Sequence, residues 1–254
     1  MVGTISGTDA FAGDANNLVV VESGNTAKIV VHRKTEDAYG GNLRLGKTRS
    51  STNTIDNNDE VGIIEFFGHD STDTNSRLAH IGCYAEADGA TNDVPGRLVL
   101  ATTADGAASP TERLRVTSRG GFQFSNGFMS ETVKINTTAR NGTQAVNLDD
   151  GMVHYFSTNS SGTWKPNFTM SAGDDINATI ATGDVFSPTM IVAKGATTHF
   201  ANAIQVDGSD VTPEFSGGAP TDGGGSGTFD VYNYTIIKTG DDTFKAFAAV
   251  STYE

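Results

Sequence analysis

The chain has 254 residues and a formal net charge of −13, and 37% of its residues are hydrophobic. An acidic chain repels phosphate backbones and anionic lipids, so the charge argues against a nucleic-acid partner and against membrane binding. A single cysteine, Cys83, excludes an intrachain disulfide and any CxxC metal or redox motif.

The composition predicts an all-β protein. Thirty glycines and many Ser, Thr, Asn and Asp residues favour short strands joined by turns, and no long stretch shows the apolar spacing of a helix. No apolar run is long enough to cross a bilayer. The first residues lack the basic and apolar regions of a signal peptide, so we expect synthesis in a host cytoplasm without the usual export.

Short strands separated by polar turns are expected throughout the first half. The candidates in chain order are "NLVVVES", "TAKIVVHRK", "NLRLGK", "VGIIEFFGHD", "RLAHIGCYAEA", "PGRLVLATT" and "TERLRVTS". Regular alternation in the last of these places Glu112, Leu114 and Val116 on one face. Arg113 and Arg115 then lie on the opposite face. The segment "TTADGAASPTE" predicts a sharp turn between the last two strands.

Residues 1–128 contain few large apolar side chains for a private core, and the usual remedy is a core shared between copies. We therefore predict a fibre-like region with intertwined subunits in an elongated homotrimer, although the spacing alone also allows a dimer. The candidate subunit-interface or structural positions are Arg97, Leu98, Leu100, Arg113, Leu114, Arg115 and Val116. For the arginines, pairing with neighbouring carboxylates is favoured over a site for an anion or a sugar acid.

Residues 129–254 predict a separate β-sandwich or jelly-roll-like domain. All arginines except Arg140 lie before this region, and its strands carry more aromatic residues. The closing "FDVYNYTIIKTGDDTFKAFAAVSTYE" predicts two strands around a Thr-Gly-Asp-Asp turn. The Gly-rich stretch 215–227 is a candidate surface contact loop. The positions chosen within it are Phe215, Gly218, Asp222 and Gly225.

Catalysis, metal binding and cofactor binding find little support in the sequence. The five histidines are scattered, without HxH or HExxH spacing, and no GxSxG motif occurs. The acidic pairs at 149–150, 174–175 and 241–242 would suit a glycan-cleaving enzyme or calcium, but each lies beside glycine in a turn-forming segment. Tyrosines and the single tryptophan, Trp164, could stack on sugars, although strand packing explains them more simply. We predict no catalytic residue, no metal and no cofactor.

A resemblance supports a structural role. "PGRL", "TTADG" and "SPTER", followed by Arg115 and Ser118, resemble a segment of tail-fibre and other virion structural proteins of tailed bacteriophages, marine phages and cyanophages included. The resemblance extends over about residues 15–127. It implies a trimeric, β-rich fibre element without catalysis. Relatives often continue into a "VGIGT" segment and an autocleaving chaperone domain, whereas this chain continues with "GFQFSNGF" and shows no such domain.

Together these features predict a virion structural protein that forms a short trimeric fibre or spike on the tail or the head and aids adhesion to the host. The expected partners are copies of itself, other tail or capsid proteins, and host surface polysaccharide. A capsid decoration or cement protein that stabilises the shell is the nearest alternative. A polysaccharide-cleaving tailspike is the second.

Overall fold

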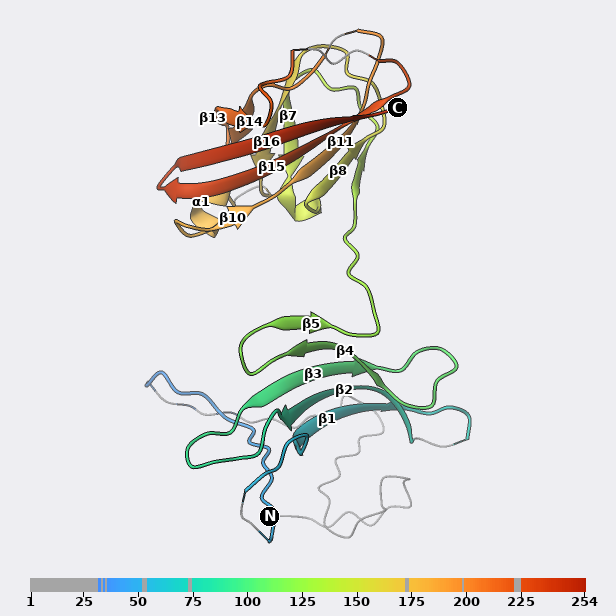
Figure 1. Cartoon of the computed structure of the whole chain (residues 1–254), viewed down its shortest axis with the longest axis vertical. Helices are drawn as coiled ribbons and strands as arrows, with labels where there is room; N and C mark the ends of the chain where they lie inside the picture. Colours follow the sequence, from blue (N-terminus) through green and yellow to red (C-terminus); the bar gives the residue numbers. More distant parts are fainter. Residues whose placement is uncertain are drawn as a thin grey trace. The chain divides into compact units, whose positions relative to one another are not determined.

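A computed structural model of the chain describes residues 32, 34, 36–51, 54–72, 75–171, 174–197, 199–221 and 225–254. The chain divides into two compact units, Met1–Met129 and Ser130–Glu254. Strands dominate both units (Figure 1), so the prediction of an all-β protein is confirmed. The predicted strands "NLVVVES" and "TAKIVVHRK" lie outside the described residues, apart from two isolated positions. No helix among the described residues is long and apolar enough to span a membrane.

The first unit contains one five-stranded antiparallel sheet in which the strands pair in chain order. Its strands are β1 (Glu60–Gly68), β2 (Ser76–Ala85), β3 (Gly96–Thr102), β4 (Thr111–Val116) and β5 (Phe122–Phe124). Gly106 adopts a φ of 76° in the turn between β3 and β4, a conformation that side chains rarely adopt. The predicted sharp turn after β3 is therefore confirmed.

The predicted strand "NLRLGK" is wrong, because residues 42–47 form no ladder. Leu45 instead lies against Gly62 of β1, so closely that a Cβ on Gly62 would come within 2.5 Å of the Cβ of Leu45. The segment is further tied by Lys47, whose ammonium binds the carboxylate of Asp59 at 2.8 Å. These side-chain contacts replace the backbone pairing of a sixth strand.

The predicted alternation in β4 is also wrong, because a register shift falls opposite Leu100 and Ala101. Glu112 pairs with Ala101, whereas Leu114 pairs with Leu100, so the bulge moves Glu112 to the opposite face from Leu114. Glu112 then shares a face with Arg115 and forms a two-bond ion pair with it, at 2.6 and 2.8 Å.

Asp59 organises the loop before β1. Its carboxylate accepts hydrogen bonds from Arg49 Nε at 2.7 Å, from Lys47 Nζ at 2.8 Å and from the backbone N–H of Asp56 at 2.9 Å. The bond from Arg49, followed by that from Lys47, holds the pKa of Asp59 well below its usual range.

Asp59→Asn should therefore lower the melting temperature of the first unit at pH 7. A carboxylate with a lowered folded-state pKa stabilises the fold above its unfolded pKa of about 3.9, and this contribution disappears as the pH falls through the folded-state value. Thermal melts from pH 7 to pH 2 should show the gap between wild type and variant narrowing below about pH 4. A gap that stays constant with pH would contradict this role.

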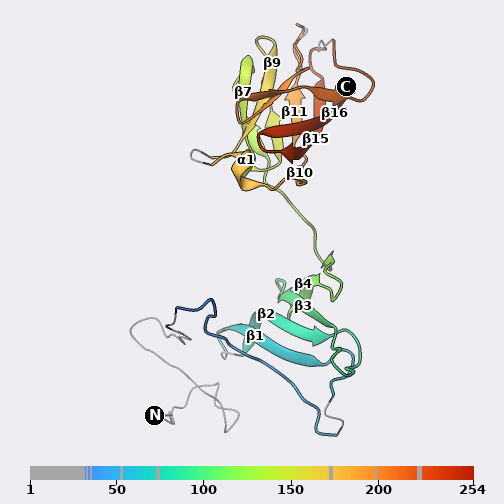
Figure 2. The ribbon, with the colours of Figure 1, turned by 90° about the vertical axis from the view of Figure 1, so that its left-hand side faces the viewer.

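The second unit contains two sheets. The seven-stranded sheet has β14 (Pro213–Phe215), β16 (Thr243–Tyr253), β15 (Phe229–Gly240), β11 (Thr189–Ala193), β8 (Val153–Phe156) and β6 (Lys134–Asn136) in that order, and β10 (Val185–Phe186) also pairs with β15. The four-stranded sheet has β13 (Ser209–Val211), β12 (Ile204–Val206), β9 (Trp164–Thr169) and β7 (Gly142–Asn147) in order. The only described helices are η1 (Leu148–Asp150) and α1 (Ile176–Thr179). Figure 2 shows β7 and β9 on one side of this unit and β11, β15 and β16 on the other.

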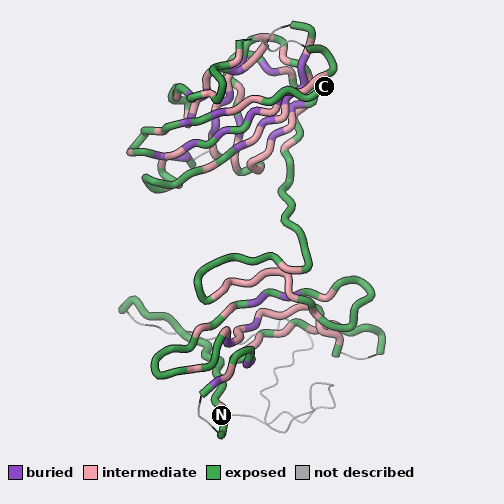
Figure 3. The backbone as a smooth tube through the Cα atoms, in the orientation of Figure 1, coloured by how far each residue is buried: buried purple, intermediate pink, exposed green. Residues whose placement is uncertain are grey.

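Aromatic contacts join the two sheets into a sandwich. Phe168 of β9 meets Tyr234 of β15 edge-on at 5.3 Å between ring centroids, and Trp164 meets Tyr232 edge-on at 5.6 Å. The β15–β16 hairpin turns at 241–242 as the Thr-Gly-Asp-Asp sequence predicts. The buried positions alternate along these strands (Figure 3), as expected for strands with one face in a core.

The two units differ sharply in their interiors. Every member of the main hydrophobic cluster lies between Val146 and Ala248, within the second unit. Among the described residues of the first unit, the buried hydrophobic side chains are Ile55, Ala85, Val99 and Ala101, which are few and mostly small. The first unit therefore has little apolar interior of its own.

Candidate functional site

One face of the sheet in the first unit is apolar and exposed. Residues directly opposite each other in an antiparallel pair point to the same side of the sheet, so the register identifies the members of each face. One row crosses all five strands and contains Ile64, Ile81, Leu100, Leu114 and Phe124. A second row contains Cys83, Leu98, Val116 and Phe122. We call these nine residues the apolar face.

The large side chains of the apolar face are accessible to solvent. The exposed fractions are 45% for Ile64, 47% for Leu98, 39% for Leu100, 72% for Phe122 and 49% for Phe124. Single exposed apolar residues are common, but a contiguous set across five strands marks an interaction surface. Leu98, Leu100, Leu114 and Val116, chosen from the sequence as interface positions, all belong to this face. Their burial against another chain stays a prediction.

The three arginines selected from the sequence bond within their own unit. Arg97 donates to the carbonyl of Ala85 at 2.8 Å and to Asn58 Oδ1 at 3.0 Å, and its guanidinium lies 5.3 Å from the ring of Tyr84. Arg113 donates to Thr102 Oγ1 at 3.0 Å and to the carbonyl of Asn126. Arg115 is the partner of Glu112 already described.

These contacts match the expectation that the arginines support the fold. The hydrogen bonds from Arg115 lower the pKa of Glu112, so this pair is charged at neutral pH. Arg97, Tyr84, His80 and Glu112 also line a small hollow of about 190 Å³ on the side of the sheet opposite the apolar face. The two faces of one sheet are thus chemically different, since one is apolar and the other is built from ion pairs and cation–π contacts.

The Gly-rich loop begins as part of the sandwich. Phe215 ends β14 and packs partly buried against the core, so it is not available as a free contact residue. Gly218 and Gly225 adopt φ values of 98° and 128°, as turns require. Asp222 lies outside the described residues. The contact role of this loop is untested.

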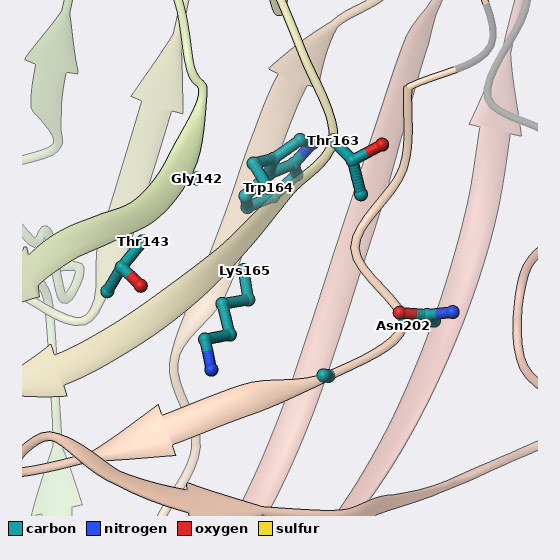
Figure 4. Close-up of a pocket in the computed structure, with 7 residues that line it drawn as sticks. Gly142, Thr143, Thr163, Trp164, Lys165 and Asn202 are labelled. Carbon is teal, nitrogen blue, oxygen red and sulfur yellow. The ribbon is translucent and has the colours of Figure 1, made fainter.

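A pocket of about 250 Å³ opens in the second unit at the start of β7 and β9 (Figure 4). It is lined by Gly142, Thr143, Thr163, Trp164, Lys165, Asn202 and Ala203. β9 pairs with β7 from Trp164 onward, but it pairs with β12 only from Asn167. Pro166 has no backbone N–H and cannot extend the ladder on both sides, so the sheet is open beside Trp164.

The acidic pairs are engaged in local structure. Asp149 accepts the N–H of Ser171 at 2.8 Å, and Asp175 caps α1 by accepting the N–H of Ala178. Asp241 accepts from the side chain of Asn177 at 3.0 Å, and Asp150 pairs with Lys134 at 2.9 Å. Among the described residues, no group of three or more His, Cys, Asp or Glu side chains is arranged to hold a metal ion.

Two sites therefore emerge that the motif alone did not identify in full. The apolar face includes Ile64, Ile81, Phe122 and Phe124, and the signal for them was the apolar pair at i and i+2 in each of the five strands. The pocket had no such signal. Its lining comes from three chain segments that only the folded sheet brings together.

No protein-family model matches the sequence, and no curated protein matches it. Among solved structures, the carboxy-terminal domain of the bacteriophage T5 L-shaped tail fibre with its intramolecular chaperone domain is similar at 16% identity and a TM-score of 0.36. That match covers 42% of this chain and 29% of the other. The same T5 tail-fibre domain in a second structure is 15% identical with a TM-score of 0.28, over 47% of this chain and 41% of the other. The chain thus spans less than half of either. Both are bacteriophage tail-fibre domains, the class of protein that the motif resembles.

Proposed function

We propose that this chain is a non-enzymatic structural protein of a tailed-bacteriophage particle, which assembles as a homotrimer into a short fibre or spike. The apolar face of the first unit carries this proposal. A sheet that exposes nine apolar positions across five strands needs a second surface to cover it. The fibre-like motif supplies much of that face, because it contains β3 and β4.

The size of the apolar face fits contact between copies. A large apolar side chain has roughly 150–250 Å² to bury, so the five most exposed members at about half exposure present on the order of 500 Å². That is as large as the largest patch on a typical monomer, about 300–600 Å². With the surrounding polar rim it approaches the ~800 Å² that each partner buries in a standard interface.

The chemical contrast between the two faces favours copies of the same chain as the occupant. The face opposite the apolar face satisfies its charges internally through Glu112–Arg115 and Glu65–Arg77. Three apolar faces turned toward a common axis would bury their apolar rows and leave these charged faces in water. This arrangement supplies the core that the first unit lacks.

The sandwich of the second unit has its own core and would be the displayed part of the assembly. Attachment to other tail or capsid proteins and weak contacts with host surface polysaccharide would add up over many copies on one particle. The loop from Phe215 to Gly225 is one candidate contact surface. In this proposal the protein is a virion component made in the cytoplasm of the host.

Sedimentation equilibrium of the full chain tests the assembly. We expect a species of three times the 26.5 kDa subunit mass that persists at low micromolar concentration. A folded single subunit under the same conditions would contradict the proposal.

Imaging of labelled particles tests the location. Copies on a tail or at isolated spikes support the fibre, whereas regular copies over the shell support a decoration protein. Release of reducing sugar from a host polysaccharide would instead support a tailspike enzyme.

A further inference from the structure

We propose that the pocket beside Trp164 binds an N-acetylated hexosamine unit. The inference deepens the proposed adhesive function by assigning it a ligand class and a site. It concerns residues of the second unit only, so its outcome is separable from the assembly of the first.

The shape of the pocket follows from how β9 pairs. Three parallel strands, β7, β9 and β12, begin near one another, but β12 joins β9 only at Asn167. The gap left beside Trp164 is bordered by Thr143 on β7 and by Asn202 just before β12, as Figure 4 shows. Sites of drug-sized ligands measure roughly 300–1,000 Å³, so a pocket of about 250 Å³ suits a single sugar ring.

The polar lining suits a neutral, polyhydroxylated ligand. Thr143 and Thr163 contribute hydroxyls and Asn202 contributes an amide, and each of these residues is exposed. Lys165 adds an ammonium group, which is already paired with Asp210. No carboxylate lies among the residues lining the pocket. These groups can donate to and accept from sugar hydroxyls, while the paired ammonium offers little net charge for an acidic sugar.

Trp164 explains why an acetamido group is preferred. Its side chain is only 3% exposed, and Nε1 has no hydrogen-bond partner among the described residues. A buried donor without a partner is unfavourable, and the carbonyl oxygen of an acetamido group placed at the base of the pocket would supply one. The acetamido methyl would rest on the apolar wall that Trp164 and Ala203 provide.

The base of the pocket is fixed before any ligand arrives. Trp164 contacts Phe156 at 6.5 Å and Tyr232 at 5.6 Å between ring centroids, and the guanidinium of Arg140 lies 5.1 Å from the indole ring. A ring held by three neighbours loses little freedom on binding, so little affinity is spent on ordering it.

Trp164 is the only tryptophan in the chain, so its fluorescence reports directly on this pocket. The assembled full chain should be titrated separately with N-acetylglucosamine, N-acetylgalactosamine and N-acetylmannosamine, and with glucose and glucuronate as comparators. We expect a saturable change with at least one N-acetyl sugar at a Kd on the order of 1 mM. Glucose and glucuronate should bind at least tenfold more weakly.

Two lining variants and one matched control locate the binding. Asn202→Ala removes an amide, and Ala203→Leu fills the pocket; each should weaken the response at least tenfold. Ser251→Leu makes a similar size change on β16 of the other sheet and should leave the response unchanged. Saturation-transfer NMR on the sugar protons gives a second readout that does not depend on fluorescence, and thermal melts identify any variant that fails to fold.

Three results would overturn the proposal. They are the absence of saturable binding for all three N-acetyl sugars, equal or tighter binding of glucose or glucuronate, and full binding by a folded Asn202→Ala variant. A trimer that binds no sugar would refute this site alone. A monomer that binds an N-acetyl sugar would refute the assembly alone.

Discussion

Replacing Leu98 and Leu100 together by glutamate should convert the assembled protein into single subunits. The two side chains occupy neighbouring rows of the apolar face and are 47% and 39% exposed in the isolated chain, so glutamates there are tolerated in a monomer. In an assembly that buries this face, each carboxylate would lose its water without gaining a partner, at a cost of several kcal/mol per charge. We expect sedimentation equilibrium to show the mass of one chain instead of three.

A matched control separates this effect from damage to the sheet. Gln123 on β5 is exposed and pairs with Arg115, so it points to the side opposite the apolar face. Gln123→Glu adds the same kind of charge there and should leave the assembly intact. The melting transition of the second unit should be unchanged in both variants. If the double variant kept the mass of the wild type, the apolar face would not be the contact between subunits.

The strand pattern of the first unit was largely predictable because local sequence determines it. Apolar residues at i and i+2, separated by turn-forming residues, identify β1 to β4 without knowledge of their partners. A strongly alternating strand has one apolar side, and a shortage of large apolar residues indicates that this side has little to pack against within one chain. Those two facts led from the sequence to the apolar face.

The β-bulge in β4 was not predictable in the same way. A bulge depends on how β4 pairs with β3, and no residue in "TERLRV" announces it. It changes the chemistry of the site, because it brings Glu112 to the side of Arg115 and leaves Leu114 in the apolar row. A one-residue change in register was enough to make the arginine pairing local.

The pocket depends on long-range pairing. The hairpin at 241–242 joins neighbouring strands and follows from its turn sequence, whereas β7, β9 and β12 pair in parallel across long connections. Pro166 is the residue whose chemistry hints at an opening, because a proline interrupts a ladder. Which segments surround that opening is decided by the whole sandwich.

Arg140→Ala should destabilise the second unit by about 3–5 kcal/mol, as expected when a large buried side chain is removed and its hydrogen-bond partners are left unpaired. Arg140 is 1% exposed. Its guanidinium donates to the carbonyl of Ala193 at 2.7 Å and to that of Thr158 at 3.0 Å, while lying 5.2 Å from the ring of Phe156. Burial lowers the pKa of Arg140 to about 10, which leaves it charged at neutral pH.

The arginine joins three parts of the sandwich, since Ala193 ends β11, Thr158 follows β8, and Arg140 itself lies just before β7. Arg140→Met fills much of the same volume but donates no hydrogen bond, so it should lose less stability than alanine, about 1–3 kcal/mol. Denaturant unfolding followed by Trp164 fluorescence measures both variants, because the indole lies against Arg140. A loss below about 1 kcal/mol for Arg140→Ala would mean that the surrounding chain satisfies the two carbonyls without the guanidinium. A loss equal in both variants would assign the stabilisation to the hydrogen bonds alone and remove the role of packing between the rings.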